Sequence, residues 1–247
     1  MIKIKTDQEV SLMRKAGEIT RQTLELLEKS VMPGVTTKQL DEIAYNFIKK
    51  SGATPSFLNY GGFPATICAS VNDEVVHGIP NDRVLQEGDI ISIDVGAKYK
   101  GYNGDSARTF AVGKISEERQ KLIDVTKQSF FEGIKGIKAG CSVGDISSQV
   151  QRYVEKHGFS VVRDLVGHGV GKELHEDPMV PNFGFAGLGP KLRANTIIAI
   201  EPMVNAGKPQ VVVDKQNGWT VSTRDGSDSA HYENTVLITE NGVEILT

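Results

Sequence analysis

Cysteine is scarce in this sequence: Cys68 and Cys141 are the only two among 247 residues. Two cysteines cannot form the disulfide framework of a small secreted protein, so we expect a protein of the reducing cytoplasm. We interpret each of them as a small buried hydrophobic residue rather than as a nucleophile.

Long apolar runs and a large excess of one charge are also missing. No stretch reaches the roughly 18 apolar residues of a membrane span, and the first ten residues, MIKIKTDQEV, lack the apolar region of a signal peptide. The net charge is −3 with 24% charged residues, which argues against a general nucleic-acid or membrane surface. Because no linker separates its halves, the chain is predicted to be a single domain, residues 1–247.

What the sequence does contain is an internal repeat. Segment 34–52 (GVTTKQLDEIAYNFIKKSG) matches segment 140–158 (GCSVGDISSQVQRYVEKHG), and both are predicted to be amphipathic helices with a hydroxyl N-cap and a terminal glycine. Two apolar strands that each finish on an acid also match, LQEGDIISID ending at Asp94 and LRANTIIAIE ending at Glu201. We predict an α+β fold of two halves, approximately 1–112 and 113–247, related by a pseudo-twofold axis. Equivalent strand ends then meet near that axis.

Each half supplies a second acid next to a strand. If residues 90–111 form an antiparallel hairpin that turns near Lys100, Asp105 lies across from Asp94. In the second half Glu233, within SAHYENT, leads another strand. Four converging carboxylates are strongly destabilising at neutral pH unless they share protons or hold cations. A metal site relieves this conflict most simply.

Histidines provide nitrogen donors beside these acids. His168 and His175 lie in the glycine-rich segment VGHGVGKELHEDP, and His77 lies in VVHGIP. One imidazole with several carboxylates is an oxygen-dominated donor set, which suits a pair of Mn, Fe or Co ions and not a four-thiolate zinc site. A nucleotide-binding loop is disfavoured because GHGVGKE lacks the GxxxxGK[ST] spacing and its hydroxyl.

Five motifs in order resemble those of type I methionine aminopeptidase in its short bacterial form: HGIP, IDV followed by NGD, GHGVG with LHEDP, IEPMVNAG, and AHYENT. The resemblance covers essentially the whole chain. It implies the pita-bread fold, in which two halves form a curved, mostly antiparallel sheet with helices outside and a dinuclear metal centre between them. It also implies a nascent-chain or peptide substrate with a small second residue, a monomeric enzyme and a transient ribosome contact.

The resemblance further implies a role for each motif residue. The ligands of the two divalent ions would be Asp94, Asp105, His168, Glu201 and Glu233. Asp105 and Glu233 would bridge the ions, Asp94 would serve one, and His168 with Glu201 the other.

Catalysis would use a metal-bridging water, with Glu201 as general base or proton shuttle. His175 would stabilise the tetrahedral oxyanion, and His77 would contact the peptide nitrogen and assist the leaving group. Next to His77 and His175, the methionine side chain would lie in an apolar pocket formed by Phe57, Tyr60, Phe63, Leu174 and Trp219.

The sequence departs from the family pattern at positions that flank ligands. His231 and Asn234 stand where many relatives have Gln and His, and Asn103 stands where a His often precedes GD. These changes are expected to affect metal preference or rate rather than the class of enzyme. A large insertion between His175 and Glu201 is absent, which disfavours the type II form, and the start at the first helix disfavours forms with an N-terminal extension or domain.

Two alternatives stay open at this point. One is a pita-bread aminopeptidase of other specificity, such as X-Pro cleavage, and the other is a non-catalytic peptide-binding relative. Metal stoichiometry separates enzyme from binder, and Met-Ala against Ala-Pro peptides separates the two enzymes.

Overall fold

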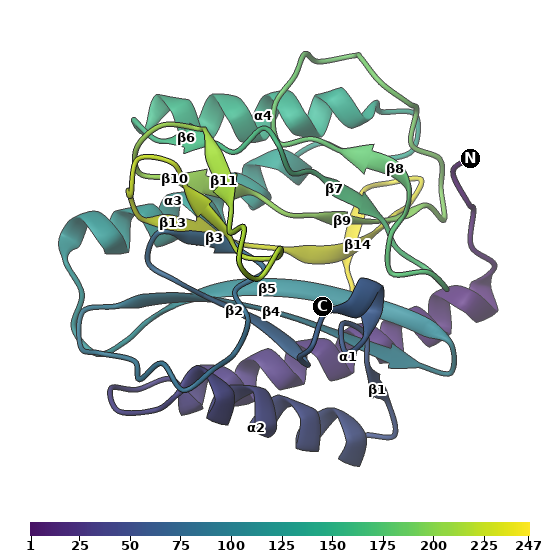
Figure 1. Cartoon of the computed structure of the whole chain (residues 1–247). Coiled ribbons are helices and arrows are strands. Elements are labelled where there is room, and N and C mark those ends of the chain that lie inside the picture. Colours follow the sequence, from purple (N-terminus) through teal and green to yellow (C-terminus); the bar gives the residue numbers. More distant parts are fainter.

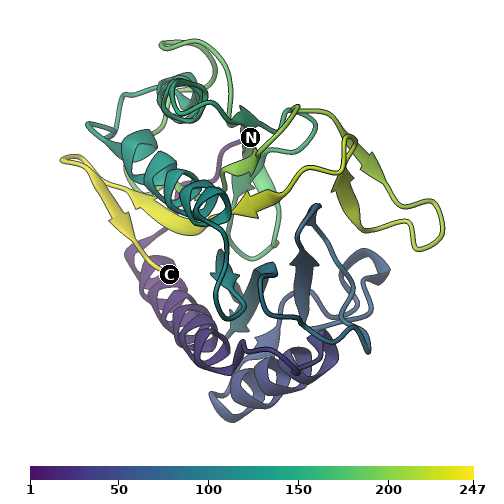
Figure 2. The ribbon, with the colours of Figure 1, turned by 90° about the vertical axis from the view of Figure 1, so that its left-hand side faces the viewer.

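The computed structural model describes all residues, 1–247, and in it the strands lie between two pairs of helices (Figure 1). One pair is α1 (Asp7–Ser30) and α2 (Thr37–Lys50), and the other is α3 (Glu117–Ile134) and α4 (Val143–Lys156). Seen from the side, both pairs stay on the outside of the strands (Figure 2). None of these helices combines the length and apolar character that crossing a bilayer requires.

The repeat predicted from the sequence is present in the backbone. α2 begins with a capping box, in which Thr36 and Gln39 bond each other's backbone N–H, and α4 begins in a related way, with the Asp145 carboxylate accepting from the Ser142 N–H (2.7 Å). Just before them, the Gly34 N–H donates to the Leu85 carbonyl (2.9 Å) and the Gly140 N–H donates to the Leu192 carbonyl (2.8 Å). Both glycines have a φ of 93°, which other residues rarely adopt. Each half therefore ties its helix pair to its acid-bearing strand in the same way.

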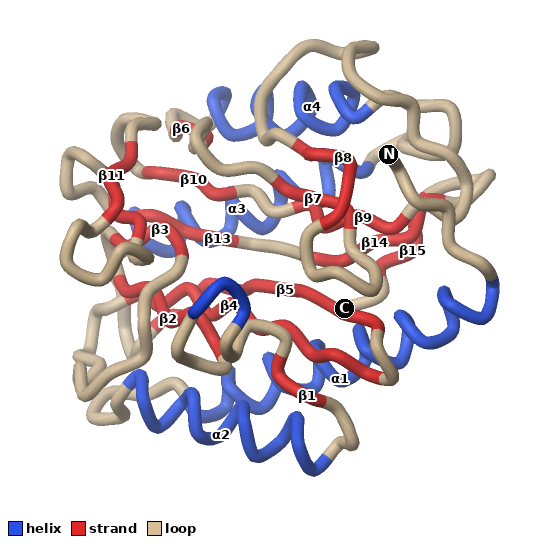
Figure 3. Tube along the Cα trace, turned by 45° about the vertical axis from the view of Figure 1, so that its right-hand side comes forward, coloured by secondary structure: helices blue, strands red, loops and turns tan.

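The strands form four small, entirely antiparallel sheets, which lie side by side between the helices (Figure 3). In chain order they are β1 (Thr54–Pro55), β2 (Ile67–Val71), β3 (Glu74–Val76), β4 (Ile90–Tyr99), β5 (Tyr102–Ala111), β6 (Ser160–Val161), β7 (Gly167–Gly169), β8 (Glu176–Val180), β9 (Ile197–Ile200), β10 (Met203–Asn205), β11 (Val211–Val213), β12 (Val221–Thr223), β13 (Ser229–His231), β14 (Asn234–Ile238) and β15 (Val243–Ile245). In the first half β4 pairs with β1, β2 and β5; in the second, the order β15-β14-β9-β7-β8 makes the largest sheet.

The predicted β4–β5 hairpin exists, but its register differs from the prediction. Asp94 lies opposite Ala107, and Asp105 lies opposite Gly96. The turn consists of Lys100 and Gly101, both with positive φ, and a two-residue turn fixes the pairing of every residue along the hairpin. The two acids are therefore diagonal neighbours on one face of the hairpin rather than directly opposed.

The prediction that both repeated strands finish on an acid is correct only in the second half. Glu201 follows the end of β9, whereas β4 continues five residues beyond Asp94 to Tyr99. The extra length is stabilised on both edges, because β4 pairs there with β5 and with the short strand β1. Asp94 therefore projects from the middle of a rigid strand.

The two halves meet along β5 and the start of β14. Ala107 and Glu233 exchange backbone hydrogen bonds (3.4 and 3.0 Å), and the Thr235 hydroxyl bonds both the N–H and the carbonyl of Asp105 (3.0 and 2.8 Å). A buried apolar cluster joins α1 to strands of the second half through Met13, Ile197 and Leu237 among others. This contact holds the acids of one half against those of the other.

Candidate metal centre and adjoining pocket

The structure brings the four predicted acids together at the contact between the halves. Asp105 comes from β5 and Glu233 from the junction of β13 and β14, and both are buried. Asp94 on β4 and Glu201 after β9 are partly buried. Single oxygens of Asp94, Asp105 and Glu233 have neither solvent contact nor a hydrogen-bond partner. Buried unpartnered carboxylate oxygens are costly, which indicates that a cation completes this site.

His168 adds a nitrogen donor to the same cluster. Its Nδ1 lies 2.9 Å from the Gly169 carbonyl, so Nδ1 carries the proton and the Nε2 lone pair faces the carboxylates. Nε2 is 3.8 Å from Asp105 Oδ2 and 3.5 Å from Glu201 Oε1. Gly169 is required here because a Cβ at this position would lie 2.1 Å from the Asp177 carbonyl oxygen.

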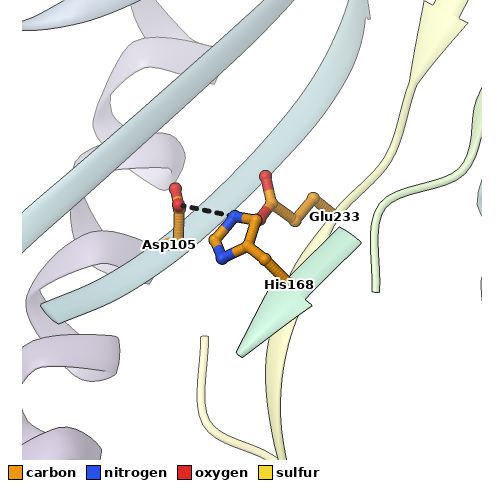
Figure 4. A group of neighbouring side chains, drawn as sticks. All are labelled: Asp105, His168 and Glu233. Carbon is orange, nitrogen blue, oxygen red and sulfur yellow. Dashed lines mark ion pairs between the residues drawn. The ribbon is translucent and has the colours of Figure 1, made fainter. Parts of the chain in front are cut away.

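The donor atoms of Asp105, His168 and Glu233 lie within 4.8 Å of one another. They come from three separate elements and point toward a common centre (Figure 4). Carboxylate oxygens with one imidazole nitrogen form a donor set for a hard or borderline divalent ion. The residues present therefore fit the metal that the sequence predicts.

The electrostatics of the site lead to the same conclusion. Burial, and then the charge of neighbouring carboxylates, raises the pKa of Asp94, Glu201 and Glu233 well above the ordinary range. Burial raises the pKa of Asp105 to about 7. Burial lowers the pKa of His168 to about 3, so at neutral pH it is a neutral imidazole, the form that binds metal. Protons or cations must neutralise the acids, because no protonated histidine does so.

A cavity of about 180 Å³ opens directly onto the acids. Its lining contains every residue that the sequence predicted for the site: Phe57, Tyr60, Phe63, His77, Asp94, Asp105, His168, Leu174, His175, Glu201, Trp219 and Glu233. It also contains Gly61 and Cys68, which the sequence analysis did not assign to the site. The prediction of a small buried hydrophobic residue is correct for Cys68, which is unpaired and buried, and wrong for Cys141, which is partly exposed.

One wall of this cavity is apolar and largely aromatic. Phe57, Phe63, Cys68 and Leu174 form a buried cluster against which Trp219 packs. The rings of Phe63 and Trp219 meet edge to face at 5.2 Å. This wall offers aromatic edges and a polarisable sulfur to a bound side chain, contacts that suit a thioether.

Two further histidines, His77 and His175, line the same cavity. His77 lies edge-on to Trp219 at 6.3 Å between ring centroids, and burial lowers its pKa to about 4. Burial also lowers the pKa of His175, whose Nδ1 is 2.8 Å from the Tyr60 hydroxyl. Its ring lies 4.1 Å from that of His168. Both are neutral at neutral pH, so they can donate a hydrogen bond without competing with a cation.

The residues that depart from the family pattern occupy defined positions around the acids. Asn103 bonds the carbonyls of Gly171 and Lys172 (both 3.0 Å) and accepts from Ser56 (2.9 Å), which ties β5 to the segment after β7. Asn234 accepts a hydrogen bond from Arg108 (2.6 Å).

His231 lies next to Glu201 and Glu233, and its buried Nε2 has no hydrogen-bond partner. Its position two residues before Glu233 was the only signal in the sequence for this contact.

Comparison with known proteins identifies the family of the chain. Residues 11–240 match the model of metallopeptidase family M24, and the chain belongs to that family. Along its whole length it is 59% identical to the methionine aminopeptidase of Clostridium acetobutylicum, of which it covers 99%. The solved methionine aminopeptidase of Thermotoga maritima superposes with a TM-score of 0.98 at 48% identity, with 100% of this chain and 99% of that chain covered.

The same comparison confirms the pita-bread fold and the resemblance drawn from the motifs. The prolidase of Pyrococcus furiosus superposes with a TM-score of 0.80 at 25% identity, covering 99% of this chain and 65% of that chain. The fold is thus shared with a prolidase, while the similarity over the full length of both proteins is to methionine aminopeptidases. The chain is a metallopeptidase, and its use of divalent metal follows from the family and the donor set.

Proposed function

We propose that this protein removes the N-terminal methionine from nascent proteins and peptides, with a preference for a small second residue. The observation that carries the proposal is that one cavity combines an aromatic, sulfur-containing wall with a buried group of carboxylates and imidazoles. At about 180 Å³ the cavity is smaller than the roughly 300 Å³ and more of typical drug-sized pockets. It therefore suits a single side chain, next to the bond to be cleaved.

Two divalent ions, of Mn, Fe or Co, would be held by the acids and His168. The residues that would hold them are Asp94, Asp105, His168, Glu201 and Glu233, as the family resemblance implies. When bound, such ions supply Lewis acidity and lower the pKa of the attacking water. The three unpartnered carboxylate oxygens of Asp94, Asp105 and Glu233 support this assignment.

Glu201 is the proposed general base or proton shuttle. Its Oε1 faces His168 Nε2 at 3.5 Å beside the cavity, where a carboxylate can take a proton from the attacking water and deliver it to the leaving amine. Its backbone is fixed by the Asn182 amide, which donates to the Glu201 carbonyl at 2.9 Å.

His175 is the proposed oxyanion donor. If the Tyr60 hydroxyl donates to Nδ1 at 2.8 Å, the imidazole proton resides on Nε2, which is then free to donate to the carbonyl oxygen as it gains charge. His77 would hold the peptide nitrogen through a hydrogen bond, since an imidazole with a pKa of about 4 is not a cationic acid at neutral pH.

We further propose that the protein acts in the cytoplasm as a single-domain monomer that meets its substrates near the ribosome. The two cysteines are unpaired, which is compatible with a reducing compartment.

The test measures methionine release from a Met-Ala-Ser peptide by metal-stripped protein, with Mn, Fe or Co added back, beside Glu201→Gln. Cleavage that depends on metal and is lost in the variant supports the proposal. An Ala-Pro peptide tests the X-Pro alternative, and two bound ions without cleavage of either peptide would favour a non-catalytic peptide binder.

A further inference from the structure

His231 is the one histidine near the acids to which the proposed function gives no role. It lies on β13 and is 2% exposed. Its Nε2 is 3.8 Å from Glu201 Oε2 and 3.9 Å from Glu233 Oε2, and it has no hydrogen-bond partner. A buried nitrogen without a partner is rare in proteins and calls for an explanation.

The two oxygens of Glu201 face different imidazoles. Oε1 lies 3.5 Å from His168 Nε2, on the side of the metal-binding group, while Oε2 lies 3.8 Å from His231 Nε2. His231 is outside the group of donor atoms that lie within 4.8 Å of one another, which is Asp105, His168 and Glu233. The two oxygens of Glu201 therefore differ: Oε1 faces the metal-binding group, and Oε2 faces the Nε2 of His231.

The backbone holds His231 rigidly in this position. Its N–H and carbonyl both bond the Thr109 hydroxyl (2.8 and 2.9 Å), which also bonds Ser92 (2.8 Å). Across the sheet, His231 pairs with Met203, two residues beyond Glu201. The backbone of His231 is therefore tied to β4 and β5 of one half and to the strand after Glu201 in the other.

There is room for Glu201 to reach this imidazole. A cavity of about 110 Å³ is lined by His77, His168, Glu201 and His231 among others. The gap of 3.8 Å exceeds an ordinary N–H···O bond by about 0.8 Å. Rotation about the broad terminal torsion of Glu201 can close such a gap.

We propose that His231 is a positioning residue that donates its Nε2 proton to Oε2 of Glu201 and so reserves Oε1 for the ion shared with His168. The inference rests on the proposed function, because it gives Glu201 its metal-facing orientation. Outer donors of this kind typically change metal affinity by 10- to 100-fold when they are removed.

The first measurement is Mn²⁺ affinity of the metal-stripped full chain, followed by electron paramagnetic resonance without substrate. His231→Leu, which has no donor, should bind Mn²⁺ about 10- to 100-fold more weakly, and His231→Gln, which keeps an N–H donor, should recover most of the affinity. His157→Gln, at the end of α4 and away from the site, is the matched control. If His231→Leu does not fold, as judged by circular dichroism, His231→Met carries the same test.

The second measurement asks whether His231 acts through Glu201. In a Glu201→Gln background, His231→Leu should weaken Mn²⁺ binding far less than it does in the wild-type chain, because the charged acceptor is gone. Pulsed measurements of nitrogen coupling should count the same number of imidazoles on the ion in wild type and His231→Gln.

Unchanged affinity in His231→Leu would overturn the proposal, as would an equal loss in both backgrounds. Loss of one imidazole signal in His231→Gln would also overturn it, because His231 would then be a direct ligand. Since metal affinity is read without peptide, failure of the wild-type protein to release methionine counts against the proposed function and not against this inference.

Discussion

Asp105→Asn should stabilise the metal-free protein at pH 8 while it abolishes tight metal binding. Asp105 is 3% exposed, and burial raises its pKa from 3.8 to about 7. At about 1.4 kcal/mol per pH unit, that difference corresponds to a native-state penalty of about 4 kcal/mol once the carboxyl is ionised. Relaxation and water entry reduce this ceiling, so we expect a gain of about 1–3 kcal/mol in the free energy of unfolding.

The pH dependence of this gain has a definite sign. Below pH 3.8 the carboxyl is protonated in the folded and unfolded chains, and Asp105→Asn changes little. Between 3.8 and about 7 the unfolded chain releases the proton while the folded chain retains it, so wild-type stability falls as pH rises. The advantage of the variant should therefore grow through this window and stay constant above it.

The assay is thermal and urea unfolding with a chelator at several pH values, with Asp82→Asn as control because its side chain is 91% exposed. For a chain of this size each kcal/mol corresponds to about 2–4 °C in Tm. Mn²⁺ at about 1,000 times Kd should reverse the order, since binding then stabilises the wild type by about 4.1 kcal/mol. A variant that is less stable than wild type at pH 8 without metal, or a difference that does not vary with pH, would refute the reasoning.

Three further substitutions test separate parts of the site. His175→Ala should lower kcat by about 10²- to 10³-fold with Mn²⁺ affinity unchanged, because it removes an oxyanion donor. Steady-state kinetics with a metal titration checks both, and a matching loss of affinity would contradict the role. Trp219→Ala should raise KM for Met-Ala-Ser by about 10-fold, with a smaller effect on kcat. The reason is that Phe63 loses its edge-to-face partner in the pocket wall. An unchanged KM would exclude Trp219 from the methionine pocket. Thr235→Val should cost about 1–3 kcal/mol in urea unfolding of the metal-free chain, because the N–H and carbonyl of Asp105 both lose the hydroxyl; a neutral result would mean that this junction contributes little.

The convergence of the acids could be predicted from the sequence, because it follows from an internal repeat and the helix caps that go with it. The details of strand pairing could not. The diagonal placement of Asp94 and Asp105 depends on a turn at Lys100 and Gly101, and a shift of one residue at a turn changes every partner along the hairpin. The length of β4 depends on β1, a two-residue strand with no periodic signal of its own.

The aromatic wall could not be predicted from a sequence pattern, for a different reason. Its members come from the irregular segment before β2, from β2 itself (Cys68), from the loop after β7, and from Trp219 just before β12, so no helical or strand period connects them. Only the family resemblance placed them in one pocket. Cys68 was missed because a single buried cysteine has no pattern, although it pairs across the sheet with Asp94.

The repeat also explains why the site is asymmetric. Asp94 and Glu201 occupy equivalent positions, yet Asp94 is held within a continuous strand while Glu201 follows a strand end, between His168 and His231. His168 lies in the glycine-rich segment 166–178 and His231 lies on β13, and both positions are outside the matched segments. The duplicated backbone therefore supplies the carboxylates in pairs, whereas the imidazoles around Glu201 come from second-half segments outside the matched ones. Two ions bound there would meet different donors: oxygen alone beside Asp94, and oxygen with nitrogen beside Glu201. Only the position beside Glu201 has an outer imidazole, His231, to orient the ligand.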